Sequence, residues 1–538
     1  MYSCPNCGNG LKFDIPSQSI YCDHCDSHFD PYQVTGQNEA EEKTVYNATI
    51  FTCPQCGGEI LSTDNTAANF CSFCGASTVL TSRLEKCSRP DYIIPFQLTK
   101  EDCKKAYLKK IRHAIYAPSA LKNAEYIDEF RGIYMPYWTY HVKQQGEMDL
   151  RGKKTYRRGD YVITDHYDLT ADLNCSYQGL SKDASSSFDD SVSDRIAPYD
   201  VRGMQDFTPS YLSGFYADTA DVESKVYEDD VLQIAADATY HAALQTPAFA
   251  GYHIDMPGSL VRATNCWMQP PQKSMFPVWF LSYRNRDRVA YATVNGQSGK
   301  TSVDLPVSIG KFVLGSLILA AAIFILLFLA PAIRPSVLLG FSVFFAIASV
   351  VLFNLELNTI IRRDSGFEDR GRFHGQIPPE ANPGSKKKAS KKKPVKGKWN
   401  PFKNHGCLTV VSLAFLGIYF LFTVGSFMAD LINTSYGKAI FWIIMLIVTV
   451  ACYYASRKKI KQLELGRHMG GSEWAVLAAI AAGVIEIVNP VSDIIYYAAA
   501  LFSLAAICIS LVRLIRFYNI SATRRLPQFD LYKGGDDR

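Results

Sequence analysis

Eight cysteines between Cys4 and Cys74 have a spacing that points to metal binding. They form four Cys-x-x-Cys pairs; fourteen residues separate the first pair from the second, and fourteen separate the third from the fourth. Two pairs at this distance can place four thiolates at the tips of two turns, and four thiolates are a ligand set of structural, tetrahedral zinc. We therefore predict two structural Zn2+ ions, one bound by Cys4, Cys7, Cys22 and Cys25 and the other by Cys53, Cys56, Cys71 and Cys74.

The cysteine pattern is a tandem repeat, since all four positions of the first set recur at one constant offset in the second. Gly8, Gly57 and Gly75 each follow a pair, where a residue without Cβ lets the backbone amide turn toward the sulfur, and Asp26 is the exception. A redox dithiol is the alternative, but it needs no second pair at a fixed distance and is typical of a βαβ surround. Residues 11–15 alternate between apolar and polar instead, as in a short strand. This pattern favours two small β zinc ribbons.

The charge of the ribbons bears on their partner. Residues 1–80 contain two lysines and nine acidic residues, and each zinc bound by four thiolates adds a further charge of −2. Phosphate contacts supply most of the affinity for nucleic acids and require Lys and Arg. Nucleic acid is therefore disfavoured as a ligand of the ribbons, and a protein partner or a role in folding is favoured. A membrane-tethered nucleic-acid-binding regulator stays as one alternative.

The region 88–306 is predicted to be a duplicated α+β domain. An amphipathic helix begins after Thr99 and stops before Pro118, and a second helix covers about 229–244. Residues 161–173 and 288–294 alternate in the manner of strands.

Two similar segments carry the prediction of a duplication. Tyr134–Trp138 and Met275–Trp279 each have a proline two residues before a tryptophan. We interpret them as the starts of equivalent strands in two related lobes. A proline at the start of a strand is tolerated because its missing N–H leaves no gap in the sheet.

The segment Asn295–Thr301 contains Gly-x-x-Gly-Lys-Thr and resembles a phosphate-binding loop at first sight. Two residues separate its glycines where a phosphate-binding loop has four, so we predict a hairpin turn that begins with Asn-Gly. The chain has no HExxH, GxSxG or GxGxxG motif. A non-enzymatic protein is therefore predicted.

The second half of the chain contains six apolar runs. They cover 312–330, 337–353, 408–428, 439–455, 474–488 and 494–512, which predicts about six transmembrane helices. With a cytoplasmic N-terminus the inner segments carry 24 Lys and Arg and the outer loops two, so we expect both termini in the cytoplasm and the protein in the cytoplasmic membrane. Glu486 and Asp493 lie near an outer turn, and their role is open. A transporter or intramembrane enzyme built on spans three to six is a further alternative.

A lysine-rich loop lies between the second and third predicted spans. Residues 1–310 carry a net charge of −9 and residues 311–538 a net charge of +14, and eight lysines of the second part lie in Lys386–Lys398. We predict that this segment is disordered and contacts anionic membrane lipids.

The order of these motifs resembles bacterial zinc-ribbon membrane proteins of the YdjG type, over residues 1–355. The ribbon, Ile94-Pro95-Phe96, the amphipathic helix, the Pro-x-Trp strand, the late Asn-Gly turn and a membrane hairpin follow one another as in that family. The resemblance implies a membrane platform that recruits a phage-shock-type stress protein through partner subunits. The doubled ribbon and four further spans depart from it.

The predicted fold is multi-domain: two tandem Cys4 zinc ribbons, a duplicated α+β cytoplasmic domain and an all-α membrane domain. The predicted boundaries are 1–35 and 48–82 for the ribbons, 88–306 for the α+β domain, 311–355 for a transmembrane hairpin, 356–406 for the basic loop, 407–515 for four further spans and 516–538 for a cytoplasmic tail. We expect this protein to present its ribbons and α+β domain as a platform for protein assembly, with a membrane-stress response as the setting that the resemblance suggests.

Overall fold

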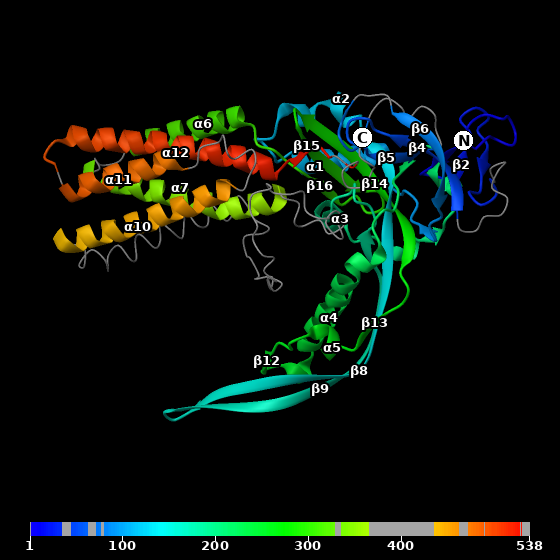
Figure 1. The fold of residues 1–538 in the computed structure, drawn as a ribbon, viewed down its shortest axis with the longest axis horizontal. Coiled ribbons are helices and arrows are strands. Elements are labelled where there is room, and N and C mark those ends of the chain that lie inside the picture. The colour runs from blue at the N-terminus through cyan, green and yellow to red at the C-terminus, as the bar shows by residue number, and fades with distance from the viewer. Residues whose placement is uncertain are drawn as a thin grey trace, which may run out of the picture. The chain divides into compact units, whose positions relative to one another are not determined.

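The computed structural model describes residues 2–34, 45–62, 71–76, 80–328, 335–364, 435–461, 472–488, 490–527 and 529 (Figure 1). The chain divides into two compact units. One comprises Met1–Phe312, Arg363–Gln376 and Ala522–Arg538, and the other comprises Val313–Arg362 and Ile377–Ser521. The C-terminal segment therefore belongs to the same unit as the N-terminal half of the chain.

Two sheets form the first unit. The smaller one is antiparallel and contains β1 (Lys12–Asp14), β2 (Ser19–Tyr21) and β3 (His28–Phe29). Fourteen strands of the described residues form the larger, mixed sheet: β4 (Val45–Thr52), β5 (Glu59–Ser62), β6 (Thr81–Ser88), β7 (Tyr92–Ile93), β8 (Arg131–Arg158), β9 (Tyr161–Asp183), β10 (Gln205–Asp206), β11 (Tyr216–Ala217), β12 (His253–Asp255), β13 (Cys266–Met268), β14 (Gln272–Asn285), β15 (Arg288–Asn295), β16 (Thr301–Val303) and β17 (Arg524–Arg525).

The segments around the second cysteine set are part of the mixed sheet. β4 pairs with β5 and β6, and β5 pairs with β11, which runs parallel to β8 in the centre of the sheet. The region 48–82 therefore shares its sheet with the predicted α+β domain.

The two similar segments meet in the middle of this sheet. Met135 of β8 lies opposite Phe276 of β14, its counterpart in the repeat, so the antiparallel register is symmetric about this pair. Pro136 and Pro277 each follow by one residue. A short parallel strand, β11 or β7, flanks each copy just before its proline. The two copies form the centre of one sheet, where the sequence suggested two lobes.

The two prolines lie inside their strands. β8 begins at Arg131 and β14 at Gln272, five residues before each proline, so the predicted position at a strand start is wrong. Each proline immediately precedes the first residue that pairs with the hairpin partner, β9 or β15. The carbonyl oxygens of Pro136 and Pro277 accept hydrogen bonds of 2.8 Å from the amides of Ala184 and Gly296. At each proline the neighbouring strand changes, from β11 to β9 beside β8 and from β7 to β15 beside β14. The missing N–H therefore lies between two pairings.

The helices of the first unit include the two that the sequence predicts. The α-helices of this unit are α1 (Lys100–Ile111), α2 (Ala124–Ile127), α3 (Asp190–Ile196), α4 (Glu228–Leu244) and α5 (Leu260–Ala263), and the two predicted ones are α1 and α4. The side chain of Thr99 caps α1, which buries Cys103, Tyr107 and Ile111 as its spacing predicts, whereas Ile115 lies beyond the helix and is exposed. The predicted Asn-Gly turn is also confirmed, since residues 296–300 connect β15 to β16.

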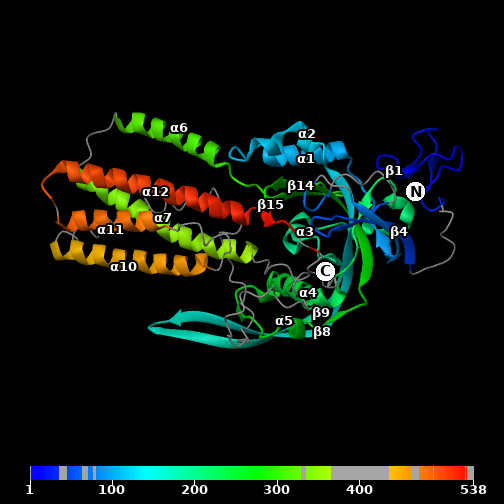
Figure 2. The ribbon, with the colours of Figure 1, turned by 45° about the horizontal axis from the view of Figure 1, so that its top comes forward.

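Strands β8 and β9 extend beyond the main sheet as a long two-stranded arm (Figures 1 and 2). Near its base, one face of the arm is covered by α4 and α5. Met148 and Leu150 of β8 are buried there against Tyr240 of α4 and Leu260 of α5. The far end of the arm has no such cover among the described residues, and its side chains are largely exposed.

The second unit is helical. Its helices are α6 (Ile309–Phe328, which begins in the first unit), α7 (Pro335–Asp364), α10 (Ser435–Ile460), α11 (Glu473–Val488) and α12 (Asp493–Ser521). Apolar side chains of α7 pack against α11 and α12, and Phe353 of α7 contacts Phe517 of α12 with ring centroids 5.4 Å apart.

Two helical stretches among the described residues are long and apolar enough to cross a membrane, not about six. They are Leu338–Ile361 in α7 and Asp493–Ile520 in α12. The shorter apolar stretches among the described side chains are Ile309–Ala321, in the predicted first span, and Glu473–Ile485, in the predicted fifth; α6 itself continues to Phe328. The predicted third span, 408–428, lies outside the described residues, and α10 covers the predicted fourth span, whose side chains the structure describes only in part.

Candidate metal centres

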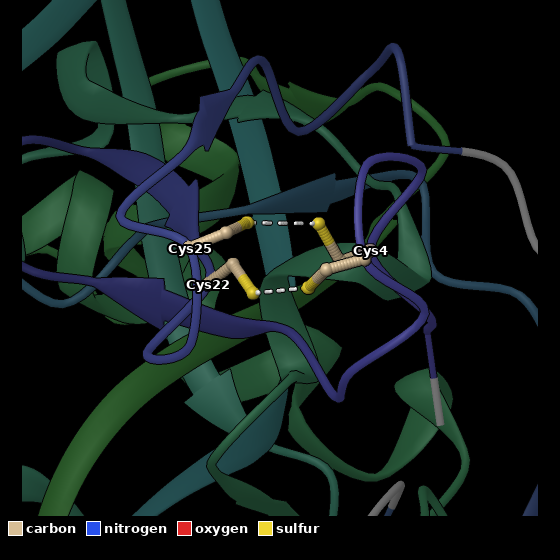
Figure 3. Close-up of side chains that lie close together, drawn as sticks. Cys4, Cys22 and Cys25 are labelled. Atoms are coloured by element: carbon tan, nitrogen blue, oxygen red, sulfur yellow. Dashed lines mark hydrogen bonds between the residues drawn. The ribbon is translucent and has the colours of Figure 1, made fainter.

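The structure brings the first four cysteines together. The Sγ atoms of Cys4 and Cys25 lie 3.5 Å apart and those of Cys7 and Cys22 lie 3.4 Å apart. Figure 3 shows the sulfurs of the two turns facing one another. All four Sγ atoms lie within 4.8 Å of one another.

The second four cysteines form a similar cluster. The Sγ atoms of Cys53 and Cys74 are 3.8 Å apart, and those of Cys56 and Cys71 are 3.7 Å apart. Four sulfurs at about 2.3 Å from one tetrahedral zinc lie about 3.8 Å from each other, whereas a disulfide needs about 2.05 Å. Both clusters therefore fit a tetrahedral metal ion held by four thiolates, and neither contains a disulfide.

The same backbone turn is repeated four times around the clusters. In each, the amide of the residue after the second cysteine donates a hydrogen bond to the carbonyl oxygen of the first cysteine; the four bonds are Gly8 to Cys4 (2.8 Å), Asp26 to Cys22 (3.0 Å), Gly57 to Cys53 (2.8 Å) and Gly75 to Cys71 (3.0 Å). The donor residue has a positive φ of 75°, 53°, 69° and 66° respectively. Positive φ explains the three glycines that the sequence places there.

Asp26 adopts the same backbone conformation without being glycine. Asp is among the residues that tolerate the left-handed region, and its side chain here has a local partner. The hydroxyl of Tyr21 donates a hydrogen bond to the Asp26 carboxylate and, as the largest cause, raises the pKa of Tyr21 to about 12. Asp26 therefore departs from the glycine pattern in sequence but forms the same turn.

The two centres differ in exposure. In the first, Cys4 and Cys22 are buried, Cys25 is half-buried and Cys7 is exposed. In the second, all four cysteines are buried in a core cluster that also contains Phe73 and Phe280. Solvent, chelators and oxidants therefore have a shorter path to the first centre.

The contacts among the thiols shift their pKa values in both directions. Hydrogen bonds with Cys53 raise the pKa of Cys56 and of Cys71. The Cys25 sulfur lies 3.3 Å from the Ser27 hydroxyl, and this hydrogen bond is the largest cause that lowers the pKa of Cys25 to about 6. Hydrogen bonds from Cys56, Cys71 and Cys74 lower the pKa of Cys53. Thiolates are the form of cysteine that binds zinc.

The C-terminal segment completes the surroundings of the second centre. The amide of Phe529 donates a hydrogen bond of 2.6 Å to the carbonyl oxygen of Cys56, and its fully buried ring lies 5.6 Å from that of Phe73. A Cβ on Gly58 would lie 2.8 Å from Phe73 and 3.2 Å from Phe529, so this position has no room for a side chain. Sequence reasoning did not find this contact.

Upstream of Phe529, the same segment is fixed to the mixed sheet. β17 pairs with β15, so that Arg525 lies opposite Arg288 and Arg524 lies opposite Val289. The guanidinium of Arg524 forms ion pairs with Asp189 at 3.2 Å and with Asp304 at 3.4 Å. The tail therefore contributes a strand, two ion pairs and an aromatic ring to the first unit. A strand of two residues has no periodicity that a sequence pattern could reveal.

Other residues singled out by sequence lie apart from the centres. Lys386–Lys398 and the side chain of Glu486 are outside the described residues. Asp493 is exposed at the start of α12.

Comparison with known proteins identifies a relative of this chain. The chain is 28% identical to the uncharacterized protein YdjG of Bacillus subtilis (strain 168) over 320 residues, which are 58% of this chain and 91% of YdjG. The resemblance to the YdjG type is confirmed. No protein-family profile matches the chain, and no solved structure matches it. The assignment of zinc ribbons therefore rests on the geometry of the cysteines, and similarity to YdjG assigns no activity.

Proposed function

We propose that this chain is a non-enzymatic, multi-pass membrane protein whose mixed-sheet unit, stabilised by two structural zinc ions, serves in the cytoplasm as a platform for protein assembly. The observation that carries the proposal is the return of the C-terminal segment, because residues 1–312 and 522–529 share one core. A membrane segment that begins and ends in one folded unit crosses the bilayer an even number of times. Helices α7 and α12 are the best candidates for two crossings.

The charges at the ends of the helices support a cytoplasmic location for the mixed-sheet unit. Glu473, at the start of α11, accepts a hydrogen bond from Arg513 of α12 at 2.6 Å and pairs with Arg457 of α10 at 3.2 Å. Lys and Arg near the ends of membrane helices are retained in the cytoplasm. The prediction of cytoplasmic termini and of anionic lipid contacts through Lys386–Lys398 belongs to this proposal.

Zinc has a structural part in this proposal. The eight cysteines of the two clusters would hold the ions, and each ion would cross-link two backbone turns that lie apart in sequence. Four-thiolate zinc leaves no open coordination position for substrate, which favours a folding role over catalysis. A membrane-stress response is the setting in which we propose that this platform binds its protein partners.

The test is to determine whether the chain is in the membrane and which proteins bind to it. We expect the full chain to remain in the membrane pellet after alkaline carbonate extraction and to co-purify reproducibly with the same partner proteins in mild detergent. Cys71→Ser should weaken partner retention by disturbing the second centre, whereas Cys508→Ser, an exposed cysteine outside both centres, should not. A chain found in the soluble fraction, or one that purifies without partners, contradicts the proposal.

A further inference from the structure

The tip of the β8–β9 arm is an exposed surface that the proposed function does not use. Arg158 and Tyr161 form the last cross-strand pair, and the two residues between them make the turn. Gly159 has a φ of +64°, and no atom lies within 4 Å of the point that a Cβ would occupy, so the turn projects freely. The Arg157 side chain donates a hydrogen bond of 3.1 Å to the Gly159 carbonyl oxygen and stabilises this turn.

The tip exposes large apolar side chains. Tyr161 is 77% exposed, Val162 is 70% exposed and Tyr156 is 48% exposed. The cross-strand pairs place Tyr156 and Tyr161 on one face of the arm and Val162 on the other. Apolar side chains therefore surround the turn on both faces.

The tip is also cationic. The last eight cross-strand pairs and the turn, residues 151–168, contain five basic residues, Arg151, Lys153, Lys154, Arg157 and Arg158, and three acidic ones, Asp160, Asp165 and Asp168, which gives a net charge of +2. Lys153 forms an ion pair of 2.7 Å with Asp255 of β12, so Arg157 and Arg158 are the basic residues closest to the turn. In the same unit, the segment 1–80 carries two lysines against nine acids. The positive charge is thus concentrated at the end of the arm, next to the exposed tyrosines.

We propose that this tip, the end of the arm between Arg151 and Asp168, inserts into the headgroup region of an anionic lipid bilayer. Tyrosine is enriched at membrane–water interfaces, and Arg and Lys are attracted to anionic headgroups. A lipid surface needs no complementary shape, so it is the partner that this charge and these side chains fit best.

The arm extends far beyond the main sheet. β14 accompanies β8 as far as Thr139, and nineteen further residues of β8 extend to Arg158. At about 3.3 Å per residue this corresponds to roughly 60 Å. The inference rests on the proposed membrane location of the chain, and it adds a lipid contact from the described part of the folded unit.

Photocrosslinking tests the proposal directly. The full chain is reconstituted into vesicles of phosphatidylcholine with phosphatidylglycerol, with benzoylphenylalanine at Val162 or, as a control on the same face of the arm, at Thr170. Mass spectrometry should find lipid adducts at residue 162 and at least about fivefold fewer at residue 170. Adducts at 162 should fall by a similar factor in vesicles of phosphatidylcholine alone, because the cationic tip then loses its counter-charge.

Charge variants separate this contact from a general effect of charge. Arg157→Gln with Arg158→Gln should reduce the adducts at 162 about fivefold, whereas the pair Arg157→Lys and Arg158→Lys should retain them. Lys109→Gln with Lys110→Gln removes the same charge from the exposed surface of α1 and should change nothing.

Two outcomes overturn the inference alone. A membrane-inserted chain whose residue 162 crosslinks to a polypeptide, including a second copy, shows that the tip docks on protein. Equal lipid adducts at 162 and 170, or none at either, show that the tip does not enter the headgroups. A chain that fails to insert into vesicles at all overturns the proposed function together with this inference.

Discussion

Each cysteine turn depends on one residue with positive φ. The spacing of the cysteines was sufficient to predict both ligand sets, and the glycines were sufficient to predict the turns, because both requirements are local. The differing space around these glycines could not be predicted, since it depends on residues distant in sequence. Gly8 has nothing within 4 Å of its Cβ direction, whereas a Cβ on Gly75 would lie 3.2 Å from Arg284 and 3.3 Å from Ser282.

We therefore predict that Gly75→Ala is more damaging than Gly8→Ala. Both substitutions place alanine at positive φ, which costs about 1–2 kcal/mol, and only Gly75→Ala adds a steric contact with the mixed sheet. The midpoint of thermal unfolding of the detergent-solubilised chain should fall further for Gly75→Ala. Equal decreases in the midpoint would show that Arg284 and Ser282 move away from the added Cβ without cost.

The difference in burial predicts two rates of metal loss. A chelator added to the full chain should remove one zinc ion quickly and the other slowly, because Cys7 is exposed while the second centre is buried throughout. Followed with a chromogenic chelator, the fast phase should disappear in Cys22→Ser and the slow phase in Cys71→Ser. A single phase, or the opposite assignment, would contradict the burial argument.

At the scale of elements, patterns with a clear period were predictable and long-range pairings were not. α1, α4, β9 and β15 begin within a few residues of their predicted positions. The extension of β8 through Pro136 was not foreseen, because proline normally argues against the interior of a sheet. The pairing of β5 with β11 and of β17 with β15 joins segments that are distant in sequence, which no local pattern encodes.

The tail contact leads to a prediction for Phe529→Ala. Removing this buried ring should destabilise the first unit by about 3–5 kcal/mol and speed zinc loss from the second centre, since the ring packs on Phe73 beside the cysteines. Phe249→Ala is the matched control. It removes a buried ring near the base of the arm and should lower stability without changing the release of zinc. Unchanged zinc release in Phe529→Ala would refute the role of the tail at this centre.

At the scale of the whole molecule, the chain combines a mixed-sheet unit that contains two four-cysteine clusters with a helical unit. The return of residues 522–529 to the first unit constrains the path of everything between. Within the described residues, two of the six predicted spans meet the length and hydropathy criteria, and the described apolar stretches of the first and fifth predicted spans are shorter. An even number of crossings is the feature that the proposed topology requires.

We predict that Ser390 and the C-terminus lie on the same side as the cysteine centres. A protease site inserted at Ser390, or appended after Arg538, should resist protease added to intact cells and be cut after the membrane is permeabilised. Cleavage at either site in intact cells would contradict the cytoplasmic location proposed for both.

The central claim is that a membrane protein carries two structural zinc ions in the folded unit that its two ends build together. Its most direct test is the molar ratio of metal to protein, measured by elemental analysis on the full chain extracted from membranes. The proposal predicts about two zinc ions per chain, about one in Cys71→Ser and two in Cys508→Ser. A chain recovered from membranes without zinc, or with iron and sulfide in its place, would contradict it.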